Sequence, residues 1–355
     1  MRVCYFGTYE RGYPRNSQVI SCLRKAGVDV EEVHLSVWDD ERSGWSAGPV
    51  QAARLAAAEA RLLLRRPRDF DAFIVGYPGQ FDLPAAHSAA RGRPIVFNPL
   101  VSLADTLVAD RGRFSAGSFA ARTLERVDRH AFRAADVVVA DTEAQARFFA
   151  ELAGLDGVPV CFVGAEERLF ELGWEAPDEF VALFVGKLIP LQGVDTILAA
   201  ARLAPDIRFR IVGSGQLDEL MNTPPPNVEW VEWVEYELLP EEIQRAGCAL
   251  GVFGTSAKAS RVIPNKAFQA LACGTPLVTA DTPAARELLV DGESALLVAP
   301  GEPEALAAAL RRLATEPELA EKLSTGGRAA YEVHASEAVL GRRWRGLVEG
   351  AVAGA

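Results

Sequence analysis

The stretch Arg261-Val-Ile-Pro-Asn-Lys-Ala-Phe-Gln-Ala-Leu-Ala-Cys-Gly-Thr-Pro-Leu-Val-Thr-Ala280 decides how the C-terminal half of the chain folds. Asn265 is a residue type favoured at helix N-caps, so we expect a helix that starts at Lys266. The helix must be short, because Gly274 suits the position after a helix and Pro276 prevents continuation. The residues that follow, Leu-Val-Thr-Ala, are typical of a buried strand.

Two polar residues of this short helix share one face of its first turn, because Lys266 and Gln269 are three residues apart. A helix N-terminus presents free N–H groups and positive potential, and a lysine there adds a full charge. That combination suits a phosphate or a diphosphate. From these residues alone a second interpretation stays open, in which Lys266 is a solvated surface residue and the helix only packs on a sheet.

Length and composition favour a packed protein of two domains. A chain of 355 residues exceeds what one hydrophobic core usually serves, and 49% of its residues are apolar. No apolar run is long enough to span a bilayer, and the first seven residues are typical of a strand, not of a signal peptide. We therefore expect a cytoplasmic protein, free or at the inner membrane surface. The five cysteines have no close pairs and are expected to be buried and reduced: Cys4, Cys22, Cys161, Cys248 and Cys273.

The net charge of −11 is unevenly distributed. Residues 1–160 hold 20 basic and 20 acidic residues, whereas residues 161–355 hold 17 and 28. Such a balance excludes a typical nucleic-acid-binding protein. Against the acidic background of the second half, the basic residues Lys258, Arg261 and Lys266 form a local exception.

Strand and helix patterns alternate along the whole chain, which predicts parallel sheets covered by helices on both faces. The pattern loosens over residues 164–178 and then starts again. We therefore predict two doubly wound domains, 1–165 and 166–334, with ligands at the carboxyl ends of the strands. Expected strands are 2–7, 28–35, 72–77, 94–98, 136–140, 160–163, 180–186, 207–213, 228–231, 249–253 and 277–280. Expected helices are 16–26, 50–66, 118–133, 143–153, 194–203, 216–221, 241–245, 266–273, 302–314, 317–326 and 337–351.

Loops that contain glycine or charge follow four of these strands, and one of the four is the stretch with Lys258, Arg261 and Lys266. Gly12 lies between the first strand and the first helix, where the backbone can approach a phosphate or a sugar. In the second half, Gly186 and Lys187 follow one strand, and Gly213 and Gly215 follow the next. Each turn alone also suits ordinary packing, but together with the nearby cations they favour a nucleoside diphosphate.

These residues resemble motifs of the retaining GT-B glycosyltransferases of family four. Phe184-Val-Gly-Lys-Leu with Gln192-Gly resembles their Gly-Arg-Leu…Lys-Gly element, and Ile211-Val-Gly-Ser-Gly resembles their Val-Gly-Asp-Gly turn. Lys266-Ala-Phe-Gln-Ala-Leu-Ala-Cys-Gly-Thr-Pro resembles their Leu-Glu-Ala-Met-Ala-Cys-Gly-Thr-Pro. The resemblance is specific over residues 180–315 and looser over 1–165. It implies two Rossmann-like domains facing across a cleft, the second binding a nucleotide-sugar donor and the first binding the acceptor. It also implies that the last helix, 335–355, packs back on the first domain.

The sequence departs from the family pattern at several positions. The paired glutamates of the family, seven residues apart, would fall near Arg261 and Gln269. Lys187 stands where the family usually has arginine, Gln192 where it has a phosphate-binding lysine, and Asn98 where an N-terminal histidine is often found. The sugar-side glutamate has no evident replacement.

The departures suggest that the cations have moved. Lys266 and Arg261 would offset the loss at Gln192, while Gln269 would still bind ribose hydroxyls. The expected donor-binding set is therefore Gly12, Gly186, Lys187, Gln192, Gly213, Gly215, Lys258, Arg261, Asn265, Lys266 and Gln269. Lys187 and Lys266 are also expected to act in catalysis, with Asp105 as the polar candidate near the acceptor and Asn98 behind it. Asp105 suits equally the role of a helix or loop cap.

The function that follows is transfer of a hexose from a UDP- or GDP-linked donor to a hydroxyl acceptor, lipid- or glycan-linked, with retention. Charge developing on the leaving diphosphate would be stabilised electrostatically. We find no Asp-x-Asp triplet that marks a metal site anywhere in the chain, so we expect neither a bridging metal nor a cofactor. The expected setting is polysaccharide or glycolipid biosynthesis. Two alternatives are a non-catalytic nucleotide-sugar-binding subunit and a GT-B epimerase. An arginine-rich helix at 50–66 is either a membrane-surface helix or an ordinary solvated one.

Overall fold

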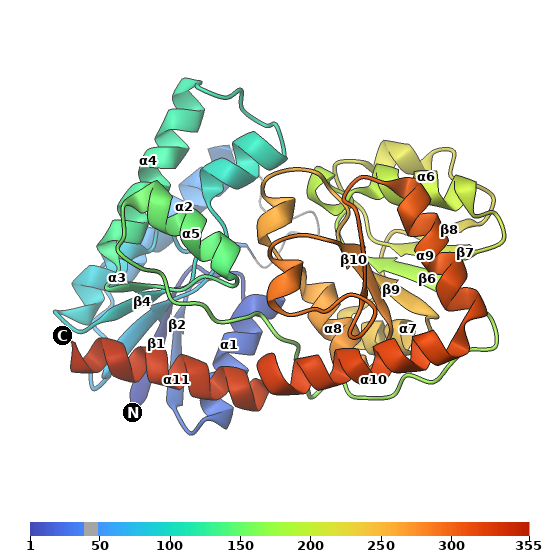
Figure 1. The fold of residues 1–355 in the computed structure, drawn as a ribbon. Helices are drawn as coiled ribbons and strands as arrows, with labels where there is room; N and C mark the ends of the chain where they lie inside the picture. The colour runs from blue at the N-terminus through green and yellow to red at the C-terminus, as the bar shows by residue number, and fades with distance from the viewer. Residues whose placement is uncertain (39–48, 355) are drawn as a thin grey trace. The chain divides into compact units, whose positions relative to one another are not determined.

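The computed structural model describes residues 1–38 and 49–354 and divides into two compact α/β units. Unit 1 consists of Met1–Val163 together with Glu337–Ala355, and unit 2 consists of Gly164–Ser336. Figure 1 shows the ribbon with its element labels. The two units are described separately below.

Unit 1 is built on a parallel sheet with the strand order β2-β1-β3-β4-β5 in the described residues. In this sheet β1 is paired along its whole length, from Arg2 opposite Asp29 to Gly7 opposite His34. The strands are β1 (Arg2–Gly7), β2 (Asp29–His34), β3 (Ala72–Val75), β4 (Ile95–Phe97) and β5 (Val137–Val138). The helices are α1 (Pro14–Lys25), α2 (Pro49–Leu62), α3 (Leu83–Ala90), η1 (Asp105–Asp110), α4 (Phe119–Ala134), α5 (Glu143–Ala153) and α11 (Glu337–Ala353).

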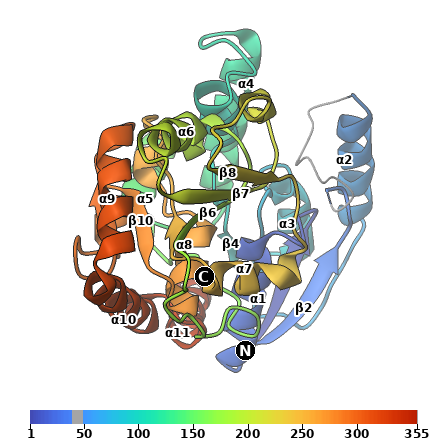
Figure 2. The same ribbon diagram turned by 90° about the vertical axis from the view of Figure 1, so that its right-hand side faces the viewer.

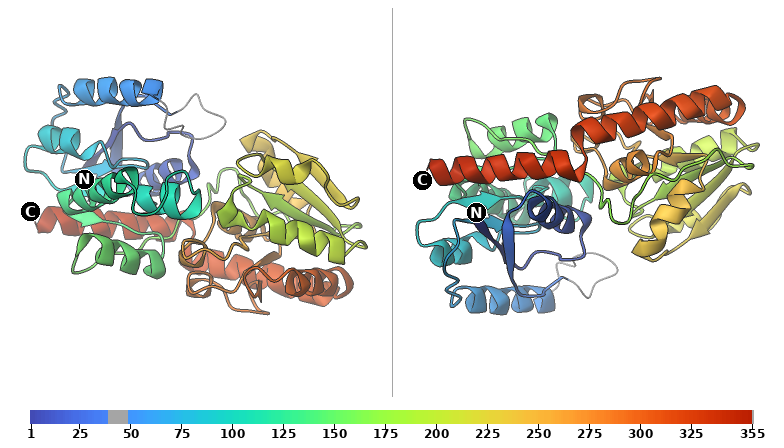
Figure 3. Two further views of the ribbon diagram at one scale, coloured as in Figure 1. Left: turned by 90° about the horizontal axis from the view of Figure 1, so that it is seen from above. Right: turned by 90° about the horizontal axis from the view of Figure 1, so that it is seen from below.

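Alternating side chains of these strands divide between two buried cores, because successive residues of a strand point to opposite faces. Cys4 and Phe6 of β1 join the core under α2, α3, α4 and α5, whereas Val3 and Tyr5 join the core under α1 and α11. Figure 3 shows α2 and α11 on opposite sides of this sheet. Helices therefore cover both faces, as the alternating pattern predicts.

The last helix of the chain belongs to unit 1. Trp344 is 1% exposed in the core beneath α1. A Cβ added to Gly341 would lie 2.4 Å from the Cys22 carbonyl oxygen, so the two helices pack with their backbones close together. Glu337 accepts hydrogen bonds from Ser21 (2.9 Å) and Lys25 (3.1 Å) of α1.

Unit 2 contains a second parallel sheet, with the order β11-β10-β9-β6-β7-β8 in the residues that the structure describes. Its strands are β6 (Val181–Val185), β7 (Arg208–Val212), β8 (Val228–Val231), β9 (Cys248–Leu250), β10 (Leu277–Ala280) and β11 (Leu296–Val298). Its α-helices are α6 (Val194–Leu203), α7 (Leu239–Gln244), α8 (Asn265–Cys273), α9 (Pro303–Thr315) and α10 (Pro317–His334). Short 3₁₀ turns lie at η2 (Pro190–Gln192), η3 (Asp218–Met221), η4 (Tyr236–Leu238), η5 (Ala259–Arg261) and η6 (Ala285–Glu287).

One face of the second sheet packs against α6 and α9, and buried side chains of these helices and of the strands form the large apolar core. Figure 2 shows the strands of this sheet nearly edge-on beside these helices. The other face carries α8, which contacts α7, α10, β9 and β10. The doubly wound architecture predicted from the sequence is confirmed in each unit.

Several elements differ from the prediction. Helix α3 was not predicted, because its sequence Leu-Pro-Ala-Ala-His-Ser-Ala-Ala contains a proline, which disfavours a helix in most positions. Here the proline lies in the first turn, where a helix tolerates it. Residues 160–163 form no strand, since only Val160 pairs, in an isolated bridge with Ala140. Helix α10 continues eight residues beyond the predicted end at Gly326. The strand β11 was not predicted either.

Candidate functional site

Two glycine loops of unit 2 lie against each other at the carboxyl ends of β6 and β7. Gly186 and Gly213 have φ values of +152° and +135°. A Cβ on Gly213 would lie 2.0 Å from the Gly186 carbonyl oxygen, and one on Gly215 would lie 2.7 Å from that of Leu188. The Trp230 indole donates to the Gly213 carbonyl (2.8 Å). These glycines are therefore required by the conformation and the close packing of the backbone.

A third loop fixes the backbone of Gln192. The Phe253 N–H, just after β9, donates to the Gln192 carbonyl at 3.1 Å. Gly193 has a φ of +67°, and a Cβ there would lie 2.5 Å from the Phe253 carbonyl carbon. Gln192 is thereby held close to the ends of the central strands. Its side-chain Oε1 is buried with no hydrogen-bond partner among the described residues.

The ammonium group of Lys266 is the main electrostatic feature of this edge. Lys266 is 7% exposed, and its Nζ lies 3.4 Å from the centroid of the Phe184 ring. A Cβ on Gly186 would lie 3.3 Å from this Nζ and 3.9 Å from the Gln192 Nε2. Within residues 1–38 and 49–354, no acceptor bonds this nitrogen. Burial holds the pKa of Lys266 well below its usual range.

These contacts decide between the two interpretations of Lys266. It is not a solvated surface residue, because it is buried against an aromatic ring at the start of α8. An ammonium group buried without an acceptor is unfavourable by several kcal/mol, and an anionic ligand would compensate it. The prediction of Asn265 as N-cap is wrong: Asn265 is the first helical residue, and Pro264 occupies the cap position with φ −71° and ψ 152°. Gly274 ends the helix in the left-handed conformation, as predicted.

Gln269 lies one turn further along α8 and is also buried. Its Nε2 donates to the Tyr236 hydroxyl (3.3 Å), which in turn donates to Glu166 (3.4 Å). Burial and the neighbouring Glu166 raise the pKa of Tyr236, so the hydroxyl stays protonated. The structure thus gives Gln269 a protein partner that the sequence did not indicate.

The remaining basic candidates of unit 2 lie around the same edge. Lys187 follows Gly186 directly and is half-buried. Lys258 is buried immediately before η5, and Arg261, half-buried, is the last residue of that turn. The structure thus places Arg261 four residues and Lys258 seven residues before Asn265, the first residue of α8.

In unit 1, Gly12 lies in the turn that precedes α1. It is exposed, and a Cβ there would meet nothing within 4 Å. The fold of unit 1 therefore does not itself require glycine at this position.

Asn98 and Asp105 follow β4, at the carboxyl edge of the first sheet. Asn98 is fully buried, and its Oδ1 accepts a hydrogen bond from the Arg15 Nε (3.0 Å). Its Nδ2 has no partner in the part of the chain that the structure describes. Asp105 is half-buried and begins η1, with its N–H bonded to the Ser102 hydroxyl (3.0 Å).

Asp128 of α4 was missed by the sequence reasoning. It is fully buried and accepts hydrogen bonds from the residues just before Asp105, namely Ser102 Oγ (2.7 Å), Leu103 N–H (2.9 Å) and Ala104 N–H (2.9 Å). A signal was present in the sequence, because Asp128 lies seven residues after Ala121 on the buried stripe of an otherwise strongly amphipathic helix.

The expectation about metals concerns carboxylate clusters. In residues 1–38 and 49–354, no group of three or more His, Cys, Asp or Glu side chains has metal-binding geometry. One Asp-x-Asp triplet does occur in the N-terminal half, Asp69-Phe70-Asp71. Asp71 immediately precedes β3 and accepts from the Arg2 N–H (2.7 Å). The triplet therefore lies at the amino ends of the strands, opposite to the edge described above.

Other surface features were also placed. The arginine-rich helix α2 exposes Arg54 and Arg61, with Leu62 buried and Leu64 78% exposed in the turn that follows. All five cysteines are buried and free, as predicted. In the described chain, no helix combines the length and the apolar character that a membrane span requires.

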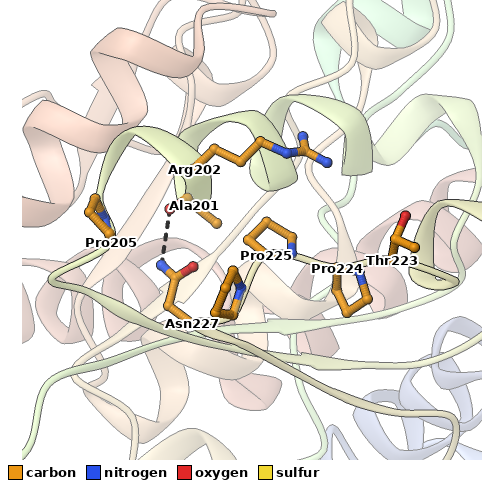
Figure 4. A pocket seen from close by; sticks show the side chains of 8 residues that line it. Ala201, Arg202, Pro205, Thr223, Pro224, Pro225 and Asn227 are labelled. Carbon is orange, nitrogen blue, oxygen red and sulfur yellow. Dashed lines mark hydrogen bonds between the residues drawn. The ribbon is translucent and has the colours of Figure 1, made fainter.

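A shallow pocket of about 400 Å³ lies between the end of α6 and the proline-rich turn before β8 (Figure 4). Asn227 closes its floor by donating to the carbonyls of Ala201 (3.0 Å), Ala204 (2.9 Å) and Ile207 (2.8 Å). Since Asn227 precedes β8, the pocket lies at the amino edge of the sheet. It does not include the Lys266 region.

Comparison with solved structures defines the class of fold. The chain superimposes on a sucrose-phosphate synthase from Thermosynechococcus elongatus with a TM-score of 0.75 and 16% identity, over 100% of both chains. It superimposes on Anabaena HepE, solved in complex with UDP-glucose, with a TM-score of 0.68 and 16% identity, over 99% of this chain and 100% of that one. The chain therefore has the GT-B fold.

Sequence comparison adds the family. Residues 179–316 match the family model described as Glycosyl transferases group 1. A D-inositol 3-phosphate glycosyltransferase from Thermomonospora curvata is 28% identical over an alignment of 241 residues that covers 54% of this chain and 52% of that protein. A second relative of the same description, from Geodermatophilus obscurus, is 28% identical over an alignment of 357 positions that covers 85% of this chain and 71% of the relative. The alignment thus spans about half the length of the first relative. The match to the group 1 glycosyltransferases therefore covers residues 179–316 of this chain.

Proposed function

We propose that this protein transfers a sugar from a nucleoside diphosphate sugar to a hydroxyl acceptor, with retention of configuration and without a metal ion. The observation that carries the proposal is the Lys266 ammonium group, which is buried beside Gly186 and Gln192 with no acceptor in the described residues. A diphosphate is an anion of suitable charge for this position. The group 1 family match and the UDP-glucose complex of HepE support a nucleotide-sugar donor.

The chemistry required of the site is stabilisation of a leaving diphosphate. The bond between the anomeric carbon and the diphosphate oxygen breaks as the acceptor oxygen attacks from the same face, through an oxocarbenium-like transition state. Lys266 would hold the negative charge that develops on the diphosphate, with Lys187 and Arg261 as further cations. The acceptor proton passes to the leaving phosphate oxygen or to Asp105. Asp105 is our candidate on the acceptor side, and the acceptor is a glycan- or lipid-linked hydroxyl compound.

Thermal unfolding with nucleotides tests the donor site. We expect one of UDP, GDP, ADP and TDP, or its sugar conjugates, to raise the midpoint, because a ligand that binds only the folded state stabilises it. Lys266→Ala should remove this shift. If none of these ligands shifts the midpoint of the wild type, the diphosphate site is refuted.

Turnover separates the proposal from its alternatives. A glycosyltransferase should release free nucleotide slowly from the donor in water and faster with an acceptor, and the anomeric signal of the product in NMR reports retention or inversion. A non-catalytic subunit would bind the donor without releasing nucleotide. An epimerase would convert the donor sugar with no acceptor present. Undiminished turnover in EDTA is expected, and loss of turnover that Mg²⁺ or Mn²⁺ restores would refute metal independence.

A further inference from the structure

The loop that follows β4 has a backbone conformation that its sequence does not favour. Leu100 is buried with a φ of +59°, in the left-handed region that a leucine side chain disfavours. The next residue, Val101, closes a tight turn by donating its N–H to the Pro99 carbonyl (2.7 Å). The loop therefore needs contacts from outside to keep this shape. Such outliers are common where a functional group must be held in place.

Those contacts come from two other elements. Gln80, between β3 and α3, donates to the Val101 carbonyl (2.8 Å) and lies 3.5 Å from Asp128 Oδ1. Asp128, on α4, accepts from Ser102 and from the N–H groups of Leu103 and Ala104. Both residues are distant from the loop in sequence. The loop is thus held by the Asp128 carboxylate of α4 and by the Gln80 side-chain amide, which lies between β3 and α3.

We propose that Asp128 is a positioning residue that holds the loop of residues 98–105 in the conformation required to present Asp105 to the acceptor. The inference rests on the proposed function, because it assigns Asp105 to the acceptor side. Asp128 itself is fully buried, so its side chain is not accessible to a ligand from solvent. Its carboxylate also occupies the N–H groups of Leu103 and Ala104, so these are not available to bind a phosphate of the acceptor.

A simple capping role is the alternative. Ser102 already bonds the N–H of Asp105, and Thr106 bonds back to the Ser102 carbonyl (2.7 Å), which together begin the turn. Asp128 adds three bonds from a separate helix, immediately after the unfavourable turn at Leu100. A cap alone would stabilise the segment without affecting how the acceptor binds.

The test compares Asp128→Ala and Asp128→Asn with Ser118→Ala. Ser118 caps the same helix by accepting from the Ala121 N–H (3.1 Å), and in the described chain it forms no hydrogen bond with residues 98–105, so its loss should weaken α4 without releasing the loop. In hydrogen exchange, we expect the Leu103 and Ala104 amides to exchange at least about tenfold faster in Asp128→Ala, relative to the rest of unit 1. Equal exchange in Asp128→Ala and Ser118→Ala would overturn the inference.

Kinetics test whether positioning matters for the acceptor. We expect Asp128→Ala to raise the acceptor KM or lower transfer at least about tenfold, while donor hydrolysis by water stays within about twofold of wild type. Asp128→Asn keeps one acceptor oxygen and should recover part of the loss. Ser118→Ala should change neither transfer to the acceptor nor donor hydrolysis. If transfer and hydrolysis fall together in Asp128→Ala, or if neither changes, the inference is wrong.

A milder variant covers the case in which Asp128→Ala does not fold. Ser102→Ala removes one bond to Asp128 and the bond to the Asp105 N–H. It should change the ratio of transfer to hydrolysis in the same direction, and an unchanged ratio overturns the inference. Absence of any donor turnover in the wild type refutes the proposed function, and the role assigned to Asp105 falls with it. If the wild type turns over the donor but the Asp128 variants leave the ratio of transfer to hydrolysis unchanged, this inference alone is refuted.

Discussion

At the scale of single residues, the chemistry of unit 2 depends on the protonation of one lysine. Lys266 is buried over the Phe184 ring, and burial lowers its pKa well below the usual value. In the unfolded chain the same group has a normal pKa, so between the two values folding requires loss of a proton. The contribution of Lys266 to stability is therefore unfavourable at neutral pH and lessens as the pH rises toward the unfolded pKa.

Donor binding should reverse this shift. An adjacent diphosphate favours the charged form of Lys266, so we expect binding of a nucleotide sugar to take up protons and to weaken as the pH rises. A nucleotide sugar is a better probe than a free nucleoside diphosphate, because the terminal phosphate of the free nucleotide itself titrates at about pH 6. Calorimetry in buffers of different ionisation enthalpy measures the protons taken up.

The matched control is an exposed lysine of unit 2. Lys266→Met should abolish proton uptake and weaken binding by about 10- to 100-fold, as expected for loss of a charge-assisted hydrogen bond. Lys322→Met should leave both quantities unchanged, because Lys322 is exposed on α10. Binding by the wild type with no proton uptake would contradict the prediction.

The sequence indicates some residues of the candidate site and not others, for a physical reason. Lys266 could be predicted because helix start, lysine and strand follow one another within a few residues. The helix pattern indicates that Asp128 is buried, but its partners could not be predicted, since Leu103 and Ala104 are more than 20 residues away and only the packing of α4 brings them together. The partner of Gln269, Tyr236, is likewise distant in sequence.

At the scale of elements, glycines explain where the helix prediction failed. A glycine near the end of a pattern predicts helix termination, which is why α10 was expected to end at Gly326. The helix continues instead to His334, with Gly326 and Gly327 packed against the loop before β11. A Cβ on Gly326 would lie 2.1 Å from the Glu293 carbonyl oxygen. The glycine pair serves close approach, which no local pattern reveals.

This gives opposite expectations for two glycine-to-alanine changes in neighbouring helices. In an exposed helix interior, alanine is more stable than glycine by about 1 kcal/mol. A Cβ added at Gly346 would meet nothing within 4 Å, so Gly346→Ala should raise the free energy of unfolding by up to that amount. Gly326→Ala should lower it by about 1–3 kcal/mol, because the contact with Glu293 overrides propensity. Urea denaturation measures both. Stabilisation by Gly326→Ala would show that the close approach is not required.

At the scale of the whole molecule, the chain leaves unit 1 at residue 163 and returns to it at residue 337. The parallel sheets and their two-sided covering were predictable from the alternating pattern, because each strand and helix is local. The strand orders, β2-β1-β3-β4-β5 and β11-β10-β9-β6-β7-β8, are set by long-range pairing that the sequence does not display.

Removing the main apolar anchor of α11 should affect one unit only. Trp344 is 1% exposed, and the centroid of its ring lies 5.3 Å from the guanidinium carbon of buried Arg15. We expect Trp344→Ala to destabilise unit 1 by about 3–5 kcal/mol, as for other buried aromatic residues, and to leave unit 2 unchanged. Hydrogen exchange resolved by segment measures the two units separately.

The control for this change is an exposed tryptophan of unit 2. Trp233 is 52% exposed, so Trp233→Ala should alter stability by no more than about 0.5 kcal/mol. Equal loss of protection in both units of Trp344→Ala would mean that the units do not unfold independently, and the assignment of α11 to unit 1 alone would fail.

The return of α11 also sets an order on the ribosome. Domains generally fold as they are synthesised, the N-terminal part first. Here the first 163 residues lack their final helix until residues 337–353 have been translated, whereas all of unit 2 is made before them. The second half of the chain can thus mature while the first half still exposes the surface around Val19 and Leu23 that α11 will cover. During translation, we therefore expect the apolar face of α1 to stay uncovered until the last helix has been made.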